Sequence, residues 1–437
     1  MLTEVNTPEG AETGRQILTQ VLSDYRGPVS IRLWDGKLAV GDEDALCTVV
    51  FHQPSMLRGL ILHRNVVHLA EAYLAGDGDI EGDIESLFDL VCYMRDLKLS
   101  WSVKWKVTRL AFSLPGKHHP VKKEIQVTQA KARGHDNTSE SIAHHYDVSN
   151  DFYRLWLDRE MVYSCAYFPE VDRSLDKAQR DKLDYICRKL RLIPNQTLLD
   201  IGCGWGALAC WAARHYGVRV HGITLSKQQH QYACERVRHE GLEGQVTIEL
   251  RDYRDLPEDV QYDRIVSVGM FEHIGVANFS RYFDIIKRAL KPEGLFLNHG
   301  ITNDTGWQDT PITHFINSYV FPDGELTRIG IVINAMEKAG FEVVDVEGLR
   351  RHYALTLRSW VQALEANREQ AIAMVGEASY RVWRLYMSGS AYYFDEGSIN
   401  IFQVLAGHNR EPLVISLRRD EMYAKGCECP PVKGEKG

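Results

Sequence analysis

The chain has 437 residues, enough for two or three domains, and its 44% hydrophobic content excludes a disordered or collagen-like protein. The formal net charge is -8, and no apolar run approaches the roughly 18 residues of a membrane-spanning helix. The nine cysteines form no Cys-x-x-Cys pair, and the polar, acidic first residues are unlike a signal peptide. We therefore expect a cytoplasmic chain with reduced cysteines.

Residues 1–114 are predicted to form a smaller N-terminal α+β domain. The segment 29–40 (VSIRLWDGKLAV) carries Asp35-Gly36 at its centre, which predicts a β-hairpin. Apolar residues have helical spacing over 57–74. The acidic segment 75–85 (AGDGDIEGDIE) has little apolar content and is predicted to be a loop.

A basic stretch runs from Lys104 to Arg133, with eight Lys or Arg residues against one acid, and Trp101 and Trp105 lie at its start. Basic residues interleaved with aromatic ones suit an anionic lipid surface. A solvated helix followed by a linker at 115–138 explains the same pattern, so both interpretations stay open. We expect no nucleic-acid partner, because the rest of the chain is acidic.

Residues 139–437 are predicted to form an α/β domain. Short apolar segments alternate with helical ones, which is typical of a buried parallel sheet wound by right-handed crossovers. The segment 353–393 is predicted to form long, aromatic-rich helices, mostly core with some side chains lining an apolar tunnel. The predicted strands are 197–202, 218–225, 246–250, 262–270, 295–301, 343–349 and 402–407.

A glycine-rich loop, 200–206 (DIGCGWG), directly follows the first of these strands and opens a helix. Its G-x-G-x-G spacing, the acid Asp200 before the first glycine, and Thr-Leu-Ser at 224–226 instead of an acid favour S-adenosylmethionine over a dinucleotide. A purely structural turn is the remaining alternative. Asp252 and Tyr253, after the third strand, are expected either to contact an adenine or to form a surface turn.

Eight ordered motifs resemble those of the cyclopropane-fatty-acyl-phospholipid synthases, a family related to the mycolic acid cyclopropane synthases. The resemblance covers about 139–408, and the part before residue 115 is similar to the family's smaller N-terminal domain. It implies a seven-stranded, Rossmann-like class I methyltransferase sheet. The motifs are HHYDVSNDFYRLWLD (144–158), MVYSCAYF (161–168), LLDIGCGWG (198–206), GITLSKQQ (222–229), MFEHIG (270–275), NHGIT (298–302), YVFPDGEL (319–326) and HYALTLRSW (352–360).

The resemblance also implies a reaction, in which a methylene group from S-adenosylmethionine is added across a cis double bond of an unsaturated phospholipid acyl chain. An alkene has no proton to remove before it attacks the methyl donor. The methyl transfer leaves a carbocation, and one proton must then leave the new methyl group so that the ring can close. A small anion held by convergent donors in a dry pocket suits this removal, and in the family this anion is bicarbonate.

By motif position, the predicted site has two sets of residues. Taken singly, Cys165 and Tyr353 are each explained as core residues, and Glu272 as a structural or cofactor-loop residue; only the combination favours catalysis. His118-His119 and His144-His145 lack further ligands at metal-binding spacing, so no metal is expected. The predicted bicarbonate set is Cys165, Glu272, His299, Tyr353 and the backbone N–H of Ile301. The predicted cofactor set is Tyr163, Ser164, Asp200, Gly202, Gly204, Thr224, Leu225, Gln229, Asp252 and Tyr253.

Two alternatives to a cyclopropane synthase stay open. One is a C-methyltransferase that leaves a methyl or methylene branch on the acyl chain, and the other is a catalytically silent lipid-binding protein with the same fold. The expected partner is membrane phospholipid, with the protein peripheral at the inner face of the membrane. The pattern leaves the oligomeric state open, a homodimer included.

Overall fold

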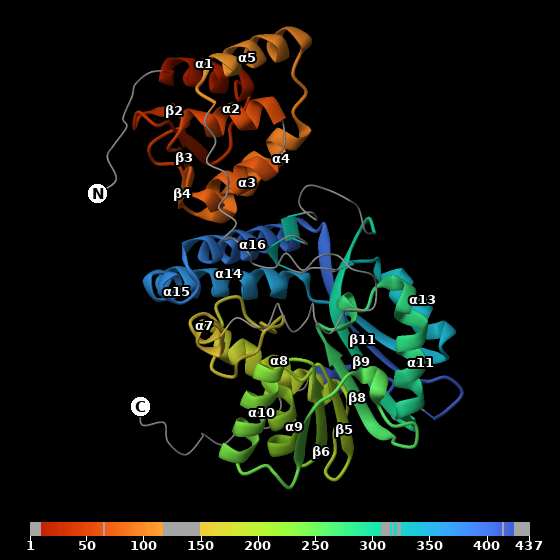
Figure 1. Cartoon of the computed structure of the whole chain (residues 1–437). Coiled ribbons are helices and arrows are strands. Elements are labelled where there is room, and N and C mark those ends of the chain that lie inside the picture. The colour runs from red at the N-terminus through yellow and green to blue at the C-terminus, as the bar shows by residue number, and fades with distance from the viewer. Residues whose placement is uncertain are drawn as a thin grey trace. The chain divides into compact units, whose positions relative to one another are not determined.

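The computed structural model describes residues 10–63, 66–116, 149–306, 315–316, 319–320, 325–412 and 415–423. Within these ranges the strands form one four-stranded and one seven-stranded sheet (Figure 1). The chain divides into two compact units, one of residues 1–130, 309–322 and 364–392, the other of residues 131–308, 323–363 and 393–437. The boundaries 1–114, 115–138 and 139–437 stay a prediction, and most of the predicted linker lies outside the described residues.

The first unit contains the four-stranded sheet, in the order β2-β1-β3-β4. β1 is antiparallel to β2 and parallel to β3, so the predicted hairpin around Asp35-Gly36 is confirmed. The predicted helical segment 57–74 holds parts of two helices, α2 and α3. The elements of this unit are α1 (Ala11–Val21), β1 (Val29–Arg32), β2 (Leu38–Val40), β3 (Cys47–Phe51), α2 (Pro54–His63), α3 (Val66–Ala75), β4 (Gly78–Gly82), η1 (Ile84–Ser86), α4 (Leu87–Asp96), α5 (Trp101–Ser113), α15 (Arg368–Val375) and most of α16 (Glu377–Glu396).

The predicted loop at 75–85 is wrong, because this segment contains the strand β4, which pairs antiparallel with β3. Two buried arginines of α16 explain how an acidic segment becomes a strand. Arg381 donates to the carbonyl of Gly78 at 3.0 Å, and Arg384 donates to that of Ile80 at 3.0 Å. These bonds satisfy carbonyl groups of β4 with donors about 300 residues away in the sequence.

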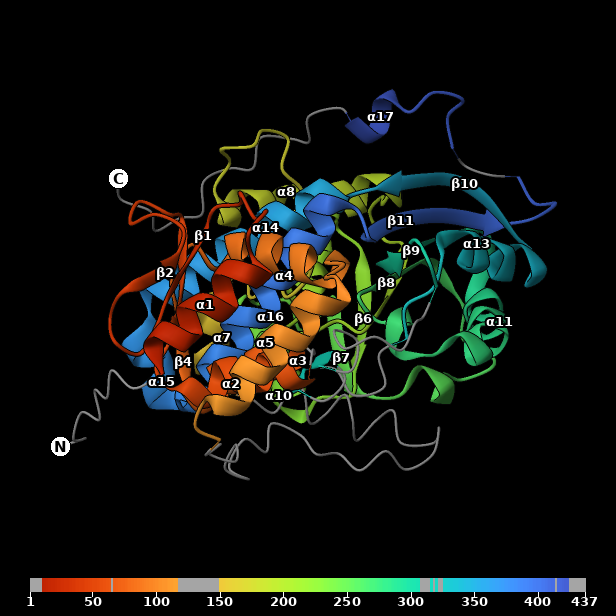
Figure 2. The ribbon, with the colours of Figure 1, turned by 90° about the horizontal axis from the view of Figure 1, so that it is seen from above.

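The second unit contains the seven-stranded sheet, in the order β10-β11-β9-β8-β5-β6-β7. The predicted class I methyltransferase sheet is confirmed. The expectation of a parallel sheet is wrong for one strand, because β11 is antiparallel to both of its neighbours, β9 and β10. Figure 2 shows these strands from above. The strands are β5 (Thr197–Ile201), β6 (Arg219–Thr224), β7 (Val246–Leu250), β8 (Tyr262–Val268), β9 (Leu290–Asn303), β10 (Phe341–Gly348) and β11 (Ile399–His408).

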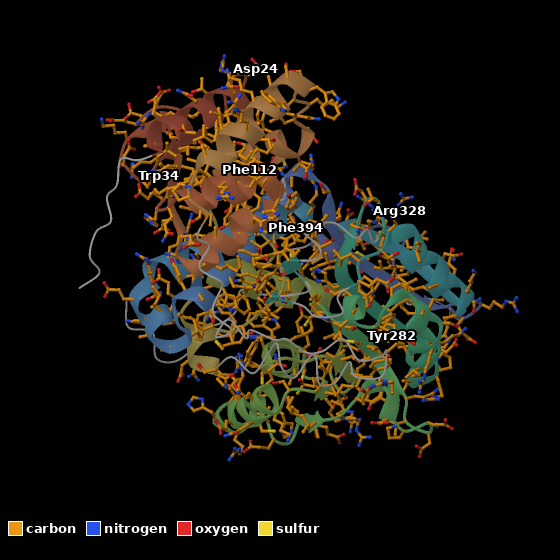
Figure 3. The ribbon with its side chains drawn as sticks, turned by 45° about the horizontal axis from the view of Figure 1, so that its top comes forward. Asp24, Trp34, Phe112, Tyr282, Arg328 and Phe394 are labelled. Carbon is orange, nitrogen blue, oxygen red and sulfur yellow. The ribbon has the colours of Figure 1, made fainter. Side chains whose placement is uncertain are left out.

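Helices cover both faces of this sheet. One core cluster joins the strands to α8, α9 and α10, and a second joins them to α11 and α13. Phe394 and Tyr282, labelled in Figure 3, are both buried. No helix within the described residues is long and apolar enough to cross a membrane. The helices of this unit are α7 (Asn150–Arg154), α8 (Leu175–Lys189), α9 (Ala207–Tyr216), α10 (Lys227–His239), η2 (Tyr253–Asp255), η3 (Phe271–His273), η4 (Val276–Asn278), α11 (Phe279–Ala289), α13 (Ile329–Lys338), α14 (Arg350–Ala366) and α17 (Asp420–Tyr423).

Candidate active site

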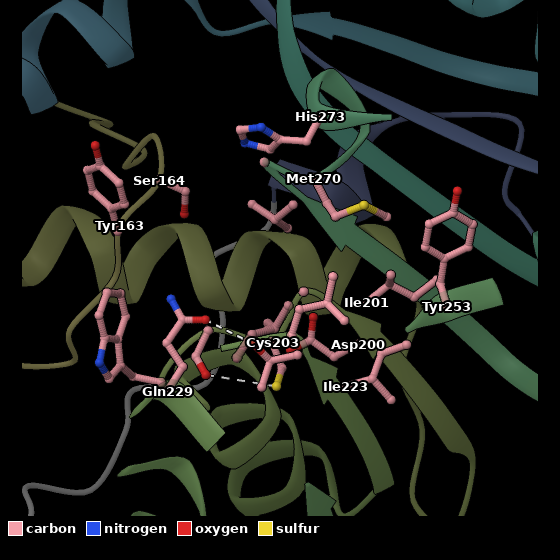
Figure 4. Close-up of a pocket in the computed structure, with 18 of the residues that line it drawn as sticks. Tyr163, Ser164, Asp200, Ile201, Cys203, Ile223, Gln229, Tyr253, Met270 and His273 are labelled. Atoms are coloured by element: carbon pink, nitrogen blue, oxygen red, sulfur yellow. Dashed lines mark hydrogen bonds between the residues drawn. The ribbon is translucent and has the colours of Figure 1, made fainter. Parts of the chain in front are cut away.

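A cavity of about 220 Å³ lies beyond the carboxyl ends of β5, β6 and β8, where ligands bind in wound α/β sheets (Figure 4). All ten residues of the predicted cofactor set line it: Tyr163, Ser164, Asp200, Gly202, Gly204, Thr224, Leu225, Gln229, Asp252 and Tyr253. The structure thus brings together residues from three of the eight motifs and from the segment after the third predicted strand at one concave site.

The glycine-rich loop forms the floor of this cavity in a backbone conformation that requires glycine. Gly202 and Gly204 have φ angles of +78° and +55°, in the left-handed region. A Cβ atom added at Gly204 would meet nothing within 4 Å, so the space over this residue is open. The N–H groups of Gly202 and Cys203 both donate to the carbonyl of Ile223, which ties the loop to β6.

Tyr163 and Ser164 precede α8 and are held over the cavity by two side chains of that helix. Gln179 donates its Nε2 to the Ser164 carbonyl at 2.9 Å, and Lys182 donates its Nζ to the Ser164 Oγ at 3.0 Å. The carboxylate of Asp158 accepts from the N–H of Val162, which fixes the start of the segment. The sequence analysis missed Lys182, although it lines the cavity and is only 2% exposed.

Lys182 and Asp200 bring opposite charges to the same cavity. Burial lowers the pKa of Lys182 to about 8, against the opposing effect of Asp158, Cys165 and Asp200. Burial raises the pKa of Asp200 to about 7, and Lys182 opposes this rise. The Oδ2 atom of Asp200 is buried and has no hydrogen-bond partner among the described residues. This oxygen is therefore available to a donor on a ligand.

Other predicted cofactor residues in the wall of the cavity form hydrogen bonds or ring contacts with neighbouring side chains. The Thr224 hydroxyl donates to Gln229 Oε1 at 2.9 Å. Asp252 accepts two bonds from the Arg254 guanidinium, at 3.0 and 2.7 Å, and Arg254 also lines the cavity. The Tyr253 ring meets Tyr282 edge-on at a centroid distance of 5.3 Å. Asp252 and Tyr253 thus present an ordered wall, as an adenine contact requires.

The predicted bicarbonate residues form a separate group around the carboxyl end of β9. Glu272 lies on η3, which follows β8, and His299 and Ile301 lie on β9, where His299 pairs with Val268. The backbone N–H of Ile301 hydrogen-bonds to the Glu272 carboxylate. A Cβ atom at Gly300 would lie 1.9 Å from Phe271 Cε1 and 2.8 Å from Glu272 Oε2, so only glycine permits this close approach.

Glu272 and His299 each leave one buried polar atom without a partner. Among the described residues, neither Oε2 of Glu272 nor Nε2 of His299 has a hydrogen-bond partner. Burial raises the pKa of Glu272 to about 7 and lowers that of His299 well below its ordinary value, with Lys182 and Lys189 lowering it further. His299 is therefore a neutral imidazole, and its Nδ1 lies 3.4 Å from the Nε2 of Gln403.

Cys165 and Tyr353 meet around a single carbonyl at the same end of the sheet. The Cys165 thiol lies 3.8 Å from the Leu349 oxygen, which also accepts from the backbone N–H of Tyr353 at 3.1 Å. The N–H of Leu349 donates to the carbonyl of Ile401 on β11, and Ile401 pairs with Ile301 on β9. These bonds link the segments that carry Cys165 and Tyr353 to the end of β9 that carries His299 and Ile301, and burial raises the pKa of the Cys165 thiol.

Several residues that line the cavity were not predicted. Met270 and His273 lie in the motif that also supplies Glu272, and burial lowers the pKa of His273 to about 4. The motif at 270–275 could have predicted both residues, whereas no local sequence pattern predicts Lys182, Arg254 or Arg281 at the cavity. Among the described residues, no group of three or more His, Cys, Asp or Glu side chains could hold a metal ion. His118, His119, His144 and His145 lie outside the described residues.

Residues 134–404 match the family model described as mycolic acid cyclopropane synthetase, and residues 16–99 match a domain of unknown function. A probable fatty acid methyltransferase of Pseudomonas putida is 41% identical over 93% of this chain and 99% of its own length. The cyclopropane-fatty-acyl-phospholipid synthase of Escherichia coli K12 is 41% identical over 60% of this chain and 66% of its own length. The crystal structure of the mycolic acid cyclopropane synthase CmaA1, complexed with SAH and CTAB, is 37% identical, with a TM-score of 0.58, and the match covers 61% of this chain and 97% of that one.

Proposed function

Because the chain belongs to the mycolic acid cyclopropane synthetase family, we propose that it adds a methylene group from S-adenosylmethionine across the cis double bond of unsaturated phospholipid acyl chains. It is an enzyme with the fold of the S-adenosylmethionine-dependent methyltransferases. The observation that carries the proposal is the pair of buried, unpartnered atoms, Glu272 Oε2 and His299 Nε2, at the end of β9. The name of the relative from Escherichia coli supports phospholipid as the substrate class.

The cavity between the glycine loop and α8 is proposed to hold S-adenosylmethionine. Its open space over Gly204 and the unpartnered Asp200 Oδ2 fit a ligand that approaches the backbone closely and carries an amine. When bound, this co-substrate supplies an activated methyl group on a sulfonium. The roles of the chain's own residues are to orient the ligand, through Ser164 and the loop, and to exclude water by burial.

The second group of residues is proposed to hold bicarbonate. The anion has one O–H donor and several acceptor oxygens, which matches a carboxylate oxygen that lacks a donor and an imidazole N–H that lacks an acceptor. Bound bicarbonate would supply the base that removes a proton from the transferred methyl group. Glu272, held by the Ile301 N–H, accepts and orients the O–H, while neutral His299 and the Tyr353 hydroxyl offer donors.

A second function, favoured by the name of the relative from Pseudomonas putida, is transfer of a methyl group that ends as a branch on the fatty acyl chain. Ring and branch formation share the methyl transfer and differ in the fate of the carbocation: loss of a methyl proton closes the ring, loss of a chain proton gives a methyl-branched alkene, and a 1,2-hydride shift followed by loss of a methyl proton gives a methylene branch. Both products gain one CH2 unit relative to the substrate, so mass alone does not separate a cyclopropane from a methyl-branched alkene.

The test uses the full chain with S-adenosylmethionine and liposomes that contain cis-monounsaturated phospholipid. Lipid mass spectrometry should show the gain of CH2, and proton NMR of the extracted lipid should show cyclopropyl signals with loss of olefinic ones. Olefinic or exocyclic methylene signals in the product would support the branching reaction instead. If S-adenosylhomocysteine is not released at all, both enzymatic proposals fail.

Peripheral attachment to the inner, anionic face of the membrane is part of the proposal, and α5 supports it. Trp101, Trp105 and Phe112 are 87%, 65% and 63% exposed, and their spacing places them on one stripe of the helix (Phe112 is labelled in Figure 3). Lys104 and Arg109 flank this stripe by the same spacing, and α5 contains no acidic residue. Exposed aromatic residues between cations suit the headgroup region of an anionic membrane.

Charge reversal tests this surface. The double variant K104E/R109E should weaken binding to anionic vesicles by at least about 30-fold, at about 1 kcal/mol for each lost cation, and should flatten its salt dependence. K37E, an exposed lysine on the β1–β2 turn, is the matched control. Lys122 and Lys123, in the same basic stretch, lie outside the described residues. Equal sedimentation of wild type and double variant with the vesicles would contradict the membrane role of α5.

A further inference from the structure

Lys182 is a buried lysine whose hydrogen bond, within the described part of the chain, goes to a neutral hydroxyl. It lies on α8, is 2% exposed, and donates to Ser164 Oγ at 3.0 Å. No carboxylate among the described residues forms an ion pair with it. A buried ammonium without a direct counter-ion is costly to fold around, because most of its hydration is lost. Its place in the wall of the cavity indicates that a ligand supplies the missing anion.

Asp200, on β5, is a buried acidic residue that, like Lys182, has no ion-pair partner among the described residues. Asp200 is the second-to-last residue of β5 and is 2% exposed. Its Oδ2 atom has no hydrogen-bond partner in the described part of the chain. Asp200 and Lys182 affect each other electrostatically, yet no direct ion pair joins these two described residues. The wall of the cavity therefore carries one buried cation, on α8, and one buried acidic side chain, on β5, that form no ion pair with each other.

We propose that Lys182 binds the α-carboxylate of S-adenosylmethionine, next to the amine that the proposed function already assigns to Asp200. Ser164, which already accepts from Lys182, turns with it toward the same carboxylate. This inference rests on the proposed placement of S-adenosylmethionine in the cavity. It adds Lys182 to the predicted residues and assigns a ligand group to a buried charge that has no ion-pair partner among the described residues.

The other cations at the cavity are less suited to this role. Arg254 is bound to Asp252 through two hydrogen bonds, and Arg251 to Glu249 at 2.6 Å. Arg281, on α11, is exposed and lies beside Tyr253, where the adenosine end is predicted. Among the described residues that line the cavity, Lys182 is thus the buried cation without a carboxylate partner.

Calorimetric binding of three ligands tests the assignment without any turnover. S-adenosylhomocysteine carries both the carboxylate and the amine, its decarboxylated analogue carries only the amine, and 5′-methylthioadenosine carries neither. For K182M we expect at least about a 30-fold loss of affinity for S-adenosylhomocysteine and less than about a threefold change for the two other ligands. For D200N we expect losses with S-adenosylhomocysteine and its decarboxylated analogue, but not with 5′-methylthioadenosine.

Two further variants make the result decisive. R281M removes an exposed cation of the same cavity and should not change the affinities selectively; a carboxylate-dependent loss in R281M instead of K182M would mean that the ligand lies the other way round. S164A removes the hydroxyl to which Lys182 donates, so the same three affinities measure the contribution of that hydroxyl apart from that of the Lys182 ammonium group. An equal loss for all three ligands in K182M would show that Lys182 only supports the 161–165 segment, and would overturn the inference. If the wild type binds none of the three, the proposed placement of the co-substrate fails instead.

Discussion

Replacing Glu272 by Gln should abolish a pH-dependent loss of stability and at the same time slow turnover. Burial raises the pKa of Glu272 to about 7 from the ordinary 4.5, and this difference corresponds to about 3 kcal/mol. The folded state binds this proton more tightly than the unfolded state. The free energy of unfolding of the wild type therefore falls as the pH rises from about 4.5 to about 7, and this contribution is constant above that range.

The E272Q variant cannot ionise at this position, so its free energy of unfolding lacks this decline. Its new amide places a buried N–H group where Oε2 lacked a partner, which costs about 1–3 kcal/mol at every pH. The diagnostic quantity is therefore the difference between the two proteins as a function of pH, which cancels the other titrating groups. It should change by about 3 kcal/mol across the range, in favour of the variant at alkaline pH.

Urea unfolding of both proteins at a series of pH values on each side of neutrality measures this difference. The matched control is E243Q, since Glu243 is exposed, and its difference from the wild type should be flat. Turnover of E272Q should fall by about 10²- to 10⁴-fold, with the affinity for S-adenosylhomocysteine within about tenfold. A flat difference for E272Q would refute the buried, proton-binding carboxyl group, and near-normal turnover would remove Glu272 from the active centre.

Three other predictions follow from the same geometry. G204V should lose binding of S-adenosylmethionine in calorimetry while its circular dichroism stays native, because a β-branched residue is strained at φ +55° and fills the open space over the loop; normal affinity would contradict the cofactor-loop assignment. H299A and C165A should lose turnover by about 10²-fold or more with little change in cofactor affinity. Removal of carbon dioxide from the buffer should lower wild-type activity, and added bicarbonate should restore it and partly rescue both variants; indifference to bicarbonate would exclude it as the base. G300A should lower thermal stability by about 1–3 kcal/mol and also lower turnover, because its Cβ would displace the Phe271 ring and the Glu272 carboxylate; a G294A control separates loss of stability from loss of function.

The sequence predicts the large sheet well because its strands are short, apolar and regularly alternated with helices. All seven predicted segments contain strands, since buried strands of wound sheets carry their signal locally. No local sequence pattern predicts that β11 runs antiparallel to its neighbours, because strand direction depends on how distant segments of the chain pair. The mistaken loop at 75–85 has the same origin: β4 is acidic, and the arginines that bind its carbonyls, Arg381 and Arg384, follow about 300 residues later.

The candidate site divides in a similar way. The cofactor set follows from motifs that each lie at the end of a strand, and the sheet brings those ends together. Lys182 could not be predicted because a lysine on a helix with spaced leucines is expected to face solvent. Its burial depends on Ser164 and on the cavity, and the sequence of α8 around Lys182 gives no sign of either. The roles of the five bicarbonate residues stay predictions that rest on the family motifs.

The segment 270–273, which contains η3, carries residues for both parts of the proposed chemistry, cofactor binding and proton removal. Met270 and His273 line the cofactor cavity, whereas Glu272, between them, turns toward Ile301 and does not line it. Cofactor affinity and proton removal are thus assigned to different faces of η3. If this division holds, substitutions on β9 and β11 can redirect the carbocation from ring to branch without weakening the binding of S-adenosylmethionine. Gln403, which contacts His299 from β11, is the position where this is expected first: Q403L should alter the ratio of cyclopropyl to olefinic product by NMR at unchanged cofactor affinity, and a parallel loss of affinity would show that the two faces are not independent.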